Sequence, residues 1–346
     1  MILNKRLEFL DILRIFAFVS VLIGHKFYEV LDGLSKSENV HLTLSFFLDA
    51  LKTLCWGGGV GVIVFFLISG YIITLVLQTE DVKVFLIKRI FRIYPLYVAA
   101  VLMEAIIGHI VNNQPYPPLS IWIPRLLLVG DFFNTPYALD NVEWTLRIEV
   151  LFYAMMALIK SLDLIKYPNY LLLIYFLITV SLGVSNPIPS KIGWGNGYIT
   201  LFLPFLFMGS CIYLMGVKKV DSILALSCIS YIFLSYLYLT PIISPLSKNS
   251  HFAALALAFF LVIWLLRFNF QNHLLIIIFS ELTYSVYFFH NWLWPYLESL
   301  VKNYPIFLGY QGVQVTLLLF LICYFFKFTI ERCGILVGKF FCEYVK

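Results

Sequence analysis

The stretch LEFLDILRIFAFVSVLIGHKFYEV, from Leu7 to Val30, decides how this chain is organised. It is long and apolar enough to cross a bilayer as one helix, yet Asp11, Arg14 and His25 lie inside it. An ionised side chain at the centre of a bilayer costs about 2.5–3.5 kcal/mol on insertion scales. We therefore expect these side chains to face a protein interior or a wet cavity and not lipid.

The polar side chains of this segment share one face of the predicted helix. Arg14 and His25 lie eleven residues apart in the sequence, about three helical turns, which separates them by roughly 16 Å along the helix axis. Asp11 falls on the same stripe. A fixed cation at one depth and a titratable imidazole at another suit a ligand that enters from one side and reacts nearer the other.

The composition is that of a polytopic membrane protein. Of the 346 residues, 61% are apolar and only 12% are charged, and the mean hydropathy is +0.91 over the whole length. The formal net charge of +5 comes without a basic block, so nucleic acid is not an expected partner. The six cysteines show no paired spacing, which predicts neither a disulfide framework nor a metal site. We expect a single membrane domain over residues 1–346.

The fold class follows from the apolar runs, which predict an all-α protein with about ten transmembrane helices. A shorter run, residues 121–133, is interrupted by Pro124 and Arg125 and predicts an interfacial or re-entrant piece. The ten longer runs lie near residues 9–30, 58–78, 94–112, 143–162, 168–185, 198–216, 222–241, 250–267, 282–300 and 310–330.

Basic residues indicate the orientation, because cytoplasmic loops carry an excess of Lys and Arg. With a cytoplasmic N-terminus, most basic residues fall on inner segments, among them Lys5, Arg6, Arg332 and Lys346. Both termini are therefore predicted to be cytoplasmic. The outer segments then hold only Lys36, Lys52, Arg125, Lys191, Lys248 and Lys302.

This orientation gives each polar group a depth. Arg14 is expected close to the cytoplasmic face, whereas His25 and Glu149 are expected at a similar depth in the outer half of the membrane. A carboxylate and an imidazole that meet across two helices form a base whose tautomer is fixed by its partner. His25 is thus the candidate general base and Glu149 its candidate orienting group. The alternative is a buried histidine that is hydrogen-bonded only for packing.

A second cluster, Lys88, Arg89 and Arg92, lies in FLIKRIFRIYPLY on a predicted cytoplasmic segment. Guanidinium groups at this spacing share a helix face and can bind phosphate bidentately, which suits a nucleotide-bearing donor. The alternative interpretation is an anchor for anionic lipid.

Two further stretches contribute candidate residues. The glycine-rich stretch GGGVGVIVFFLISGYIIT contains Gly59, Gly61 and Ser69. The backbone N–H groups at the start of such a helix can stabilise an anion. The alternative is that the small residues let helices pack closely, which is the favoured interpretation for Ser69. ELTYSVYFFHNWLW places Tyr284, Ser285 and His290 on one predicted helix, and His290, nearer mid-membrane, is its site candidate.

Taken together, these motifs resemble acyltransferase family 3, membrane acyltransferases that modify bacterial surface glycans. LDILRIFAFVSVLIGH resembles the family's first helix, with Arg14 and His25 at its arginine-x10-histidine spacing, and GVGVIVFFLISGYIIT, RIFRIYPLY, EWTLRIEVLFY and LTYSVYFFH resemble its later signatures. The resemblance implies a cytoplasmic acyl-CoA donor, a hydroxyl acceptor outside, a catalytic His25, and Arg14, Arg89 and Arg92 in donor binding or site architecture. Supporting roles are expected for Asp11, Gly59, Gly61, Ser69, Tyr284, Ser285, His290 and Glu331.

The chain departs from the family pattern at Glu331, which is followed by Arg332 and Cys333 where a glutamate-x-proline pattern is usual. We also expect no extracytoplasmic domain of the kind that some members carry, so that the acyl group is expected to reach its acceptor directly or with the help of a separate partner.

The resulting prediction is a multi-pass O-acyltransferase of the bacterial cytoplasmic (inner) membrane. It moves an acyl group, with acetyl the expected one, from acyl-CoA to a hydroxyl of a cell-surface glycan such as lipopolysaccharide, or of another extracytoplasmic acceptor. Acyl-CoA is a co-substrate, and no tightly bound cofactor or metal is expected. The competing class is a secondary transporter that uses intramembrane Arg, His and Glu as a substrate and proton relay, although we find no internal repeat of the kind that such folds commonly show.

Overall fold

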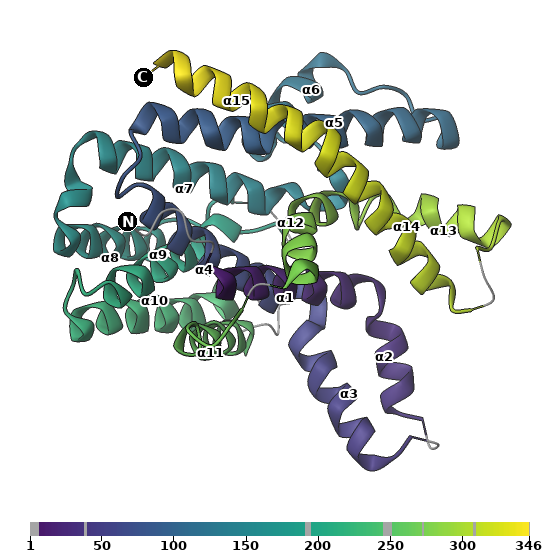
Figure 1. The fold of residues 1–346 in the computed structure, drawn as a ribbon, viewed down its shortest axis with the longest axis horizontal. Coiled ribbons are helices and arrows are strands. Elements are labelled where there is room, and N and C mark those ends of the chain that lie inside the picture. Colours follow the sequence, from purple (N-terminus) through teal and green to yellow (C-terminus); the bar gives the residue numbers. More distant parts are fainter. Residues whose placement is uncertain are drawn as a thin grey trace.

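A computed structural model of the chain describes residues 7–37, 40–190, 195–244, 251–271, 273–306 and 309–345. All the regular secondary structure in these ranges is helical, and most of the helices lie along one common direction (Figure 1). The predicted all-α fold class is confirmed.

The centre of the bundle is built by three helices, α1 (Glu8–Lys26), α4 (Gly59–Val76) and α9 (Tyr198–Gly216). Glycines allow their backbones to approach closely, since a Cβ atom on Gly70 would overlap the carbonyl oxygen of Leu206, and one on Gly209 would overlap that of Leu67. Close backbone contact of this kind fixes the relative depth of the helices that carry the polar side chains.

The other helices surround this centre. Figure 1 shows α5, in blue, running beside α15, in yellow, along the top of the bundle. Gly334 on α15 lies against the carbonyl oxygen of Phe91 on α5, which leaves no room for a side chain there. The surrounding helices are α5 (Val82–Asn112), α7 (Glu143–Ser161), α8 (Pro168–Val184), α10 (Ser222–Ile243), α11 (His251–Leu265), α12 (Leu274–Phe289), α14 (Gln311–Phe326) and α15 (Arg332–Val345).

The structure has five helical stretches that are long and apolar enough to cross a membrane, or six if a bent pair counts as one span. These numbers of helical stretches refer to the residues that the structure describes. The helices α1 and α7 fall outside this count because each carries several charged side chains, and the number of ten spans stays a prediction. The five stretches are Leu42–Val76, Val82–Asn112, Tyr198–Gly216, Ser222–Ile243 and Gln311–Val345.

The predicted orientation is not tested by the helices themselves. Figure 1 shows that α1 begins on the side of the bundle at which α15 ends. Four of the basic residues used for the orientation, Lys5, Arg6, Lys191 and Lys248, lie outside the described residues, as does Lys346. The cytoplasmic location of the termini stays a prediction.

One apolar run was wrongly predicted to be a single helix. Residues 282–300 are divided between α12, which ends at Phe289, and α13 (Trp294–Asn303), with a bend of 94° between them. Pro295 lies in the first turn of α13, where the missing N–H is tolerated and a new helix readily begins. The bend leaves His290 at the end of α12, 1% exposed.

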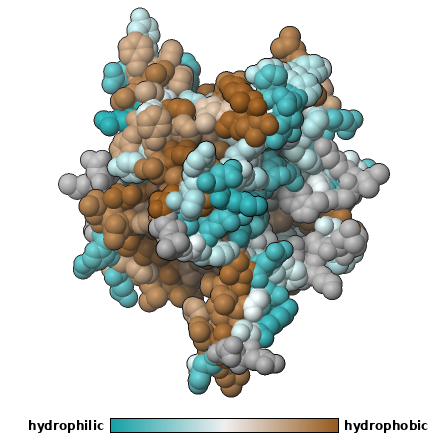
Figure 2. All heavy atoms as spheres, turned by 90° about the vertical axis from the view of Figure 1, so that its right-hand side faces the viewer, coloured by the Kyte–Doolittle hydropathy of each residue, from teal (hydrophilic) through white to brown (hydrophobic). Residues whose placement is uncertain are grey.

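The sequence also failed to predict two helices near the N-terminus. The segments α2 (Tyr28–Ser35) and α3 (Leu42–Cys55) form a hairpin that projects from the bundle at the bottom of Figure 1. Lys52 on α3 is 2.8 Å from Asp32 on α2, and hydrogen bonds from Lys36 and Lys52 lower the pKa of the Asp32 carboxyl. Figure 2 shows the hairpin with an apolar flank beside a polar one. Each helix is too short to give the signal of a span.

The remaining predictions of local structure concern residues 121–133 and the end of the last helix. The helix α6 (Leu119–Leu126), which is followed by the 3-10 turn Gly130–Phe133, is too short to cross a membrane, as predicted. After Phe326 the chain continues through a π-helical turn, Lys327–Glu331, into α15. A proline after Glu331 would break this continuity, and its absence explains why the helix continues.

Candidate functional site

Three cavities follow one another through the bundle. We call them the outer chamber, the middle cavity and the vestibule, and their volumes are about 310, 100 and 490 Å³. The outer chamber and the middle cavity share Val62 and Tyr287 as wall residues, and the middle cavity and the vestibule share Arg14, Arg92 and Tyr284. Because neighbouring cavities share wall residues, they lie in a row along the bundle, and we call this row of cavities the path.

The outer chamber holds His25, near the C-terminal end of α1. The Nδ1 atom of His25 is 3.0 Å from Nε2 of His290, and its Nε2 atom is 3.2 Å from the carbonyl oxygen of Gly57. Gly57 has a φ angle of 56°, a left-handed conformation that glycine adopts without strain. The glycine turn before α4 thus aims a carbonyl group at the imidazole.

A second set of hydrogen bonds surrounds this pair. The Nδ1 atom of His290 is 2.7 Å from the carbonyl oxygen of Tyr287. Lys26 donates to Oδ1 of Asn291 at 2.7 Å, and Asn291 donates to the carbonyl oxygen of Asp140 at 3.1 Å. The end of α1, the bend after α12 and the segment before α7 are therefore linked at the chamber.

The walls of the outer chamber combine aromatic rings with hydroxyl and amide groups. Asp140 is the carboxylate among the chamber residues, and His25 and His290 supply the imidazoles. The aromatic residues are Trp144, Tyr198, Phe202, Tyr236, Phe252 and Tyr287, and the amide and hydroxyl residues are Asn141, Asn196, Thr240, Ser244 and Asn291.

The predicted pairing of Glu149 with His25 is wrong. Glu149 lines the middle cavity and accepts a hydrogen bond from Ser69, whereas the ring nitrogens of His25 contact His290 and Gly57. The reason is position along the helices, because Glu149 lies about 9 Å along α7 from the start of that helix, while His25 lies near the C-terminal end of α1. Ser69, which we interpreted as a small packing residue, is instead a polar wall residue of the path.

The three arginines expected on the donor side come together. Arg14, Arg89 and Arg92 all line the middle cavity, and Arg14 donates to the buried Asp11 at 2.8 Å. Lys88, by contrast, forms an ion pair with Glu80 and is not a wall residue of the three cavities. The structure thus separates two arginines of the cluster from its lysine.

The vestibule adds three basic residues that were not predicted to belong to a site. Lys327, Arg332 and Lys339 line it together with Arg14 and Arg92. Two carboxylates also lie there: Glu281, which pairs with Lys327, and Glu331, which is largely buried. The vestibule therefore carries more positive than negative side chains.

Two supporting candidates from α12 differ in position. Tyr284 lines both the middle cavity and the vestibule, and its buried hydroxyl has no hydrogen-bond partner among the described residues. Ser285 is fully buried, and its hydroxyl also has no hydrogen-bond partner among the described residues, but Ser285 is not a wall residue of the three cavities. The arrangement favours a ligand-facing position for Tyr284 and not for Ser285.

Gly59 and Gly61 provide room at the start of α4. A Cβ atom on Gly61 would overlap the carbonyl oxygen of Ala17 on α1, and one on Gly59 would overlap the ring of Phe252. Gly59 is also a wall residue of the outer chamber. The close approach of α1 and α4, which brings His25 to the glycine turn, therefore depends on Gly61.

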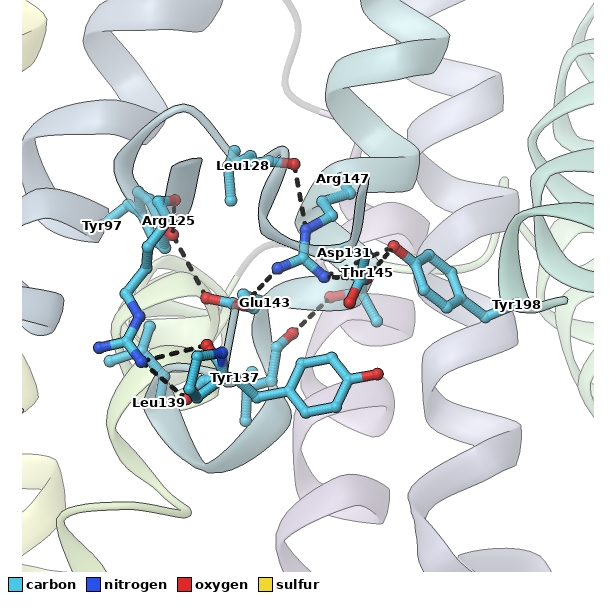
Figure 3. Close-up of polar contacts among 12 residues, drawn as sticks. Tyr97, Arg125, Leu128, Asp131, Tyr137, Leu139, Glu143, Thr145, Arg147 and Tyr198 are labelled. Carbon is cyan, nitrogen blue, oxygen red and sulfur yellow. Dashed lines mark hydrogen bonds and ion pairs between the residues drawn. The ribbon is translucent and has the colours of Figure 1, made fainter. Parts of the chain in front are cut away.

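A buried ion cluster beside the outer chamber was not predicted from the sequence. Figure 3 shows Arg147 between Glu143 and Asp131, with Nε donating to the carbonyl oxygen of Leu128 at 3.0 Å. Tyr198 donates to Asp131 at 2.7 Å. The cluster ties the segment before α7, which includes the chamber residues 140–142, to the bundle. The i, i+4 spacing of Glu143 and Arg147 was the available signal.

Comparison with known proteins connects this geometry to a family. The family model described as an acyltransferase domain, Acyl_transf_3, matches residues 7–331. The chain belongs to this acyltransferase family. The matched range of this acyltransferase 3 protein includes His25, His290 and Glu331, together with Arg14, Arg89 and Arg92. It covers the outer chamber and the middle cavity, and it ends within the vestibule, before Arg332.

One curated relative is Acyltransferase MdmB of Streptomyces mycarofaciens, which is 31% identical over 103 residues. The match covers 28% of this chain and 27% of that protein. No solved structure matches the chain. Among the described residues, no group of three or more His, Cys, Asp or Glu side chains is placed to hold a metal ion.

Proposed function

We propose that this acyltransferase 3 protein transfers an acyl group from acyl-CoA, bound at the vestibule, to a hydroxyl group of an acceptor in the outer chamber. The observation that carries the proposal is the path that joins a cationic vestibule to an imidazole pair, in a chain of an acyltransferase family. In the proposed arrangement, ten helices span the bacterial cytoplasmic membrane, and the vestibule faces the cytoplasm together with both termini.

The vestibule suits the phosphate groups of coenzyme A. Guanidinium groups bind phosphate in a bidentate manner and lysine adds point charges, and Arg14, Arg92 and Arg332 lie there with two lysines. Deeper in the path, the Nε atom of Arg89 and the hydroxyl of Tyr284 are buried without partners among the described residues. Buried donors of this kind require acceptors, and the amide carbonyls of a pantetheine arm would supply them.

The outer chamber suits a hydroxyl-rich, largely uncharged acceptor. Amide and hydroxyl side chains can bind the hydroxyl groups of a sugar, and the aromatic walls can contact its apolar ring faces. Glycans of the cell surface, including lipopolysaccharide, are the proposed acceptor class, and acetyl is the proposed acyl group.

The reaction that this geometry allows is direct acyl transfer. His25 accepts the proton of the acceptor hydroxyl at Nε2 while the hydroxyl oxygen attacks the thioester carbonyl carbon. The C–S bond then breaks, and the thiolate of coenzyme A takes the proton back from the imidazolium. The acceptor leaves as an ester and coenzyme A as a free thiol, so atoms and charges balance without a further reactant.

The experiment compares surface glycans by mass spectrometry from cells that lack the gene and cells that express wild-type, His25→Ala or His109→Ala protein. His109 is exposed and binds the carbonyl oxygen of Gln114, away from the three cavities, and serves as the matched histidine control. We expect an acyl ester with the wild type and the control, and its loss with His25→Ala. Identical glycans in all four strains, with the proteins present in the membrane, would contradict the proposal. Under the competing transporter hypothesis, the glycans stay unchanged and a solute is taken up.

A further inference from the structure

The two histidines of the outer chamber come from distant parts of the sequence, on α1 and after α12. Their ring centroids are 5.2 Å apart with an angle of 27° between the planes, and the contact between the rings is Nδ1 of His25 to Nε2 of His290 at 3.0 Å. A 3.0 Å separation of two nitrogens is a hydrogen bond only if one of them carries the proton.

The second partner of the His290 ring, the carbonyl oxygen of Tyr287, decides which of the two nitrogens carries the proton. A carbonyl oxygen only accepts, so the contact of His290 Nδ1 with the Tyr287 carbonyl at 2.7 Å requires the proton on Nδ1. A neutral imidazole has one N–H group, and Nε2 of His290 is therefore an acceptor. His25 must then donate from Nδ1, which leaves the lone pair of His25 on Nε2.

The remaining contact of His25 is the longest of the three, and two neutral rings cannot make all three contacts as hydrogen bonds, so the assignment gives precedence to the two shorter ones. In the neutral state, Nε2 of His25 and the carbonyl oxygen of Gly57, 3.2 Å apart, are both acceptors and do not bond. Once Nε2 gains a proton, the same contact becomes a hydrogen bond. The carbonyl group of Gly57 is thus placed to stabilise the protonated ring and not the resting one.

We propose that His290 is a positioning residue that holds His25 in the tautomer whose basic Nε2 faces the outer chamber, and that the Gly57 carbonyl receives the proton-bearing Nε2 during the reaction. The inference rests on the proposed function for its catalytic meaning. A carboxylate plays this part in a serine protease triad, where it fixes the imidazole tautomer and orientation without taking the proton. Here a neutral imidazole, fixed by a backbone carbonyl, takes that place.

Other charged groups face the pair but do not replace this bond. Lys26 follows His25 on α1 and donates to Asn291, while Asp140 approaches from the segment before α7 and its carbonyl oxygen accepts from Asn291. The glycine turn before α4 contributes only backbone groups at this point. The tautomer of His25 therefore depends on His290.

The first test reads the tautomer directly. Nitrogen NMR of the full-length protein in lipid bilayers, with isotope-labelled histidine, distinguishes protonated from unprotonated ring nitrogens, and the chain has only six histidines. His25→Gln assigns the signal of His25. Above neutral pH, we expect His25 to be protonated at Nδ1 in the wild type and in His109→Phe, and to move toward the Nε2–H tautomer in His290→Phe. A His25 ring that carries its proton on Nε2 in the wild type overturns the proposal.

A second variant separates the hydrogen bond from folding. His290→Gln retains a carbonyl oxygen that can accept from Nδ1 of His25, so we expect it to keep more of the Nδ1–H tautomer than His290→Phe does. If His290→Phe fails to fold, the comparison of His290→Gln with the wild type decides the matter. A His25 tautomer that is the same in every folded variant of His290 also overturns the proposal.

The catalytic arm uses acetyl-CoA and membranes that contain the acceptor glycan, and it follows release of the thiol. Proton transfer by a positioned base contributes about 10²–10⁴-fold, and loss of its orientation is expected to remove about 10- to 100-fold of that from kcat in His290→Phe, with a smaller loss in His290→Gln. KM for acetyl-CoA should stay unchanged, because the donor binds at the other end of the path. A tautomer change without any effect on kcat contradicts the catalytic role of the pair. Absence of thiol release from the wild type contradicts the proposed function and leaves the tautomer assignment to the NMR result.

Discussion

The substitution Arg147→Met tests whether the buried ion cluster holds the outer chamber together. Arg147, Glu143 and Asp131 are each no more than 4% exposed, and Arg147 is the cation that pairs with both carboxylates. Methionine fills much of the same space but leaves the two carboxylates without their cation and removes the donor to the Leu128 carbonyl.

The expected loss is large, because breaking a buried ion pair by removing one partner costs about 3–5 kcal/mol. The neutral triple variant Asp131→Asn, Glu143→Gln, Arg147→Met is the control, since removing all three charges leaves none of them uncompensated. We expect the triple variant to recover most of the lost free energy of unfolding. Arg147→Lys should fall between, because an ammonium group restores the charge but not the fork that serves two carboxylates at once.

The free energy of unfolding is measured in mixed micelles by titration with a denaturing detergent, with the seven tryptophans as the fluorescent signal. A folded Arg147→Met protein should still bind acetyl-CoA, because the cluster lies beside the outer chamber and not the vestibule. If Arg147→Met unfolds within about 0.5 kcal/mol of the wild type, as a neutral surface substitution does, the cluster is not the brace that we infer. A triple variant less stable than Arg147→Met would also refute the reasoning.

Three further predictions address the other end of the path and the centre of the bundle. Arg92→Ala should weaken acetyl-CoA binding about tenfold, which is the lower end of what a hydrogen bond to a charged group contributes. The control Lys83→Ala removes an exposed lysine of the same helix and should leave the affinity unchanged. Equal affinities of the two variants in isothermal titration would favour the lipid-anchor interpretation of Arg92. Glu149→Gln should slow acyl transfer but leave the acidic limb of the pH–rate profile unchanged, because Glu149 does not contact His25. A shifted acidic limb would show that Glu149 and His25 are coupled. Gly70→Val should lower the free energy of unfolding by at least about 1–3 kcal/mol, because the new side chain would overlap the backbone of α9. A variant with the wild-type melting temperature would mean that α4 and α9 can move apart to accept the side chain.

Much of the path was predictable from the sequence because it depends on a single helix. The spacing of Arg14 and His25 places them on one stripe, and the penalty for charges in lipid directs that stripe inward. The structure puts Arg14 in the wall of the middle cavity and the vestibule and His25 in the wall of the outer chamber, whereas their depth relative to the cytoplasm stays a prediction. Local periodicity was sufficient here, since both residues belong to the same regular element.

The partner of His25 could not be predicted in the same way. The run 282–300 was predicted to be one apolar span, but the structure bends by 94° after α12, and His290 lies at this bend in the wall of the outer chamber. The choice of Glu149 rested on counting residues from the start of a helix, which ignores how deeply that start is buried. Pro295, in the first turn of α13, was the local signal for the bend.

The ion cluster shows a second limit. The pairing of Glu143 and Arg147 was visible as an i, i+4 spacing, but Asp131 joins them from a segment without regular periodicity. Contacts between a helix and an irregular segment depend on the course of the backbone, which residue patterns do not specify. The vestibule residues Arg332 and Lys339 on α15 were not predicted for the same reason, whereas Glu331 in the π-helical turn was expected as a supporting residue from the family resemblance.

The most direct test of the central claim is transfer across the membrane from a labelled donor. Radiolabelled acetyl-CoA is added to inside-out membrane vesicles, so that it reaches only the cytoplasmic face, and base-labile label is then measured in the glycan fraction enclosed by the vesicles. We predict label with wild-type protein and with His109→Ala, and none above background with His25→Ala. Equal labelling by His25→Ala, or no labelling by folded wild-type protein in vesicles that contain the acceptor glycan, would contradict the account.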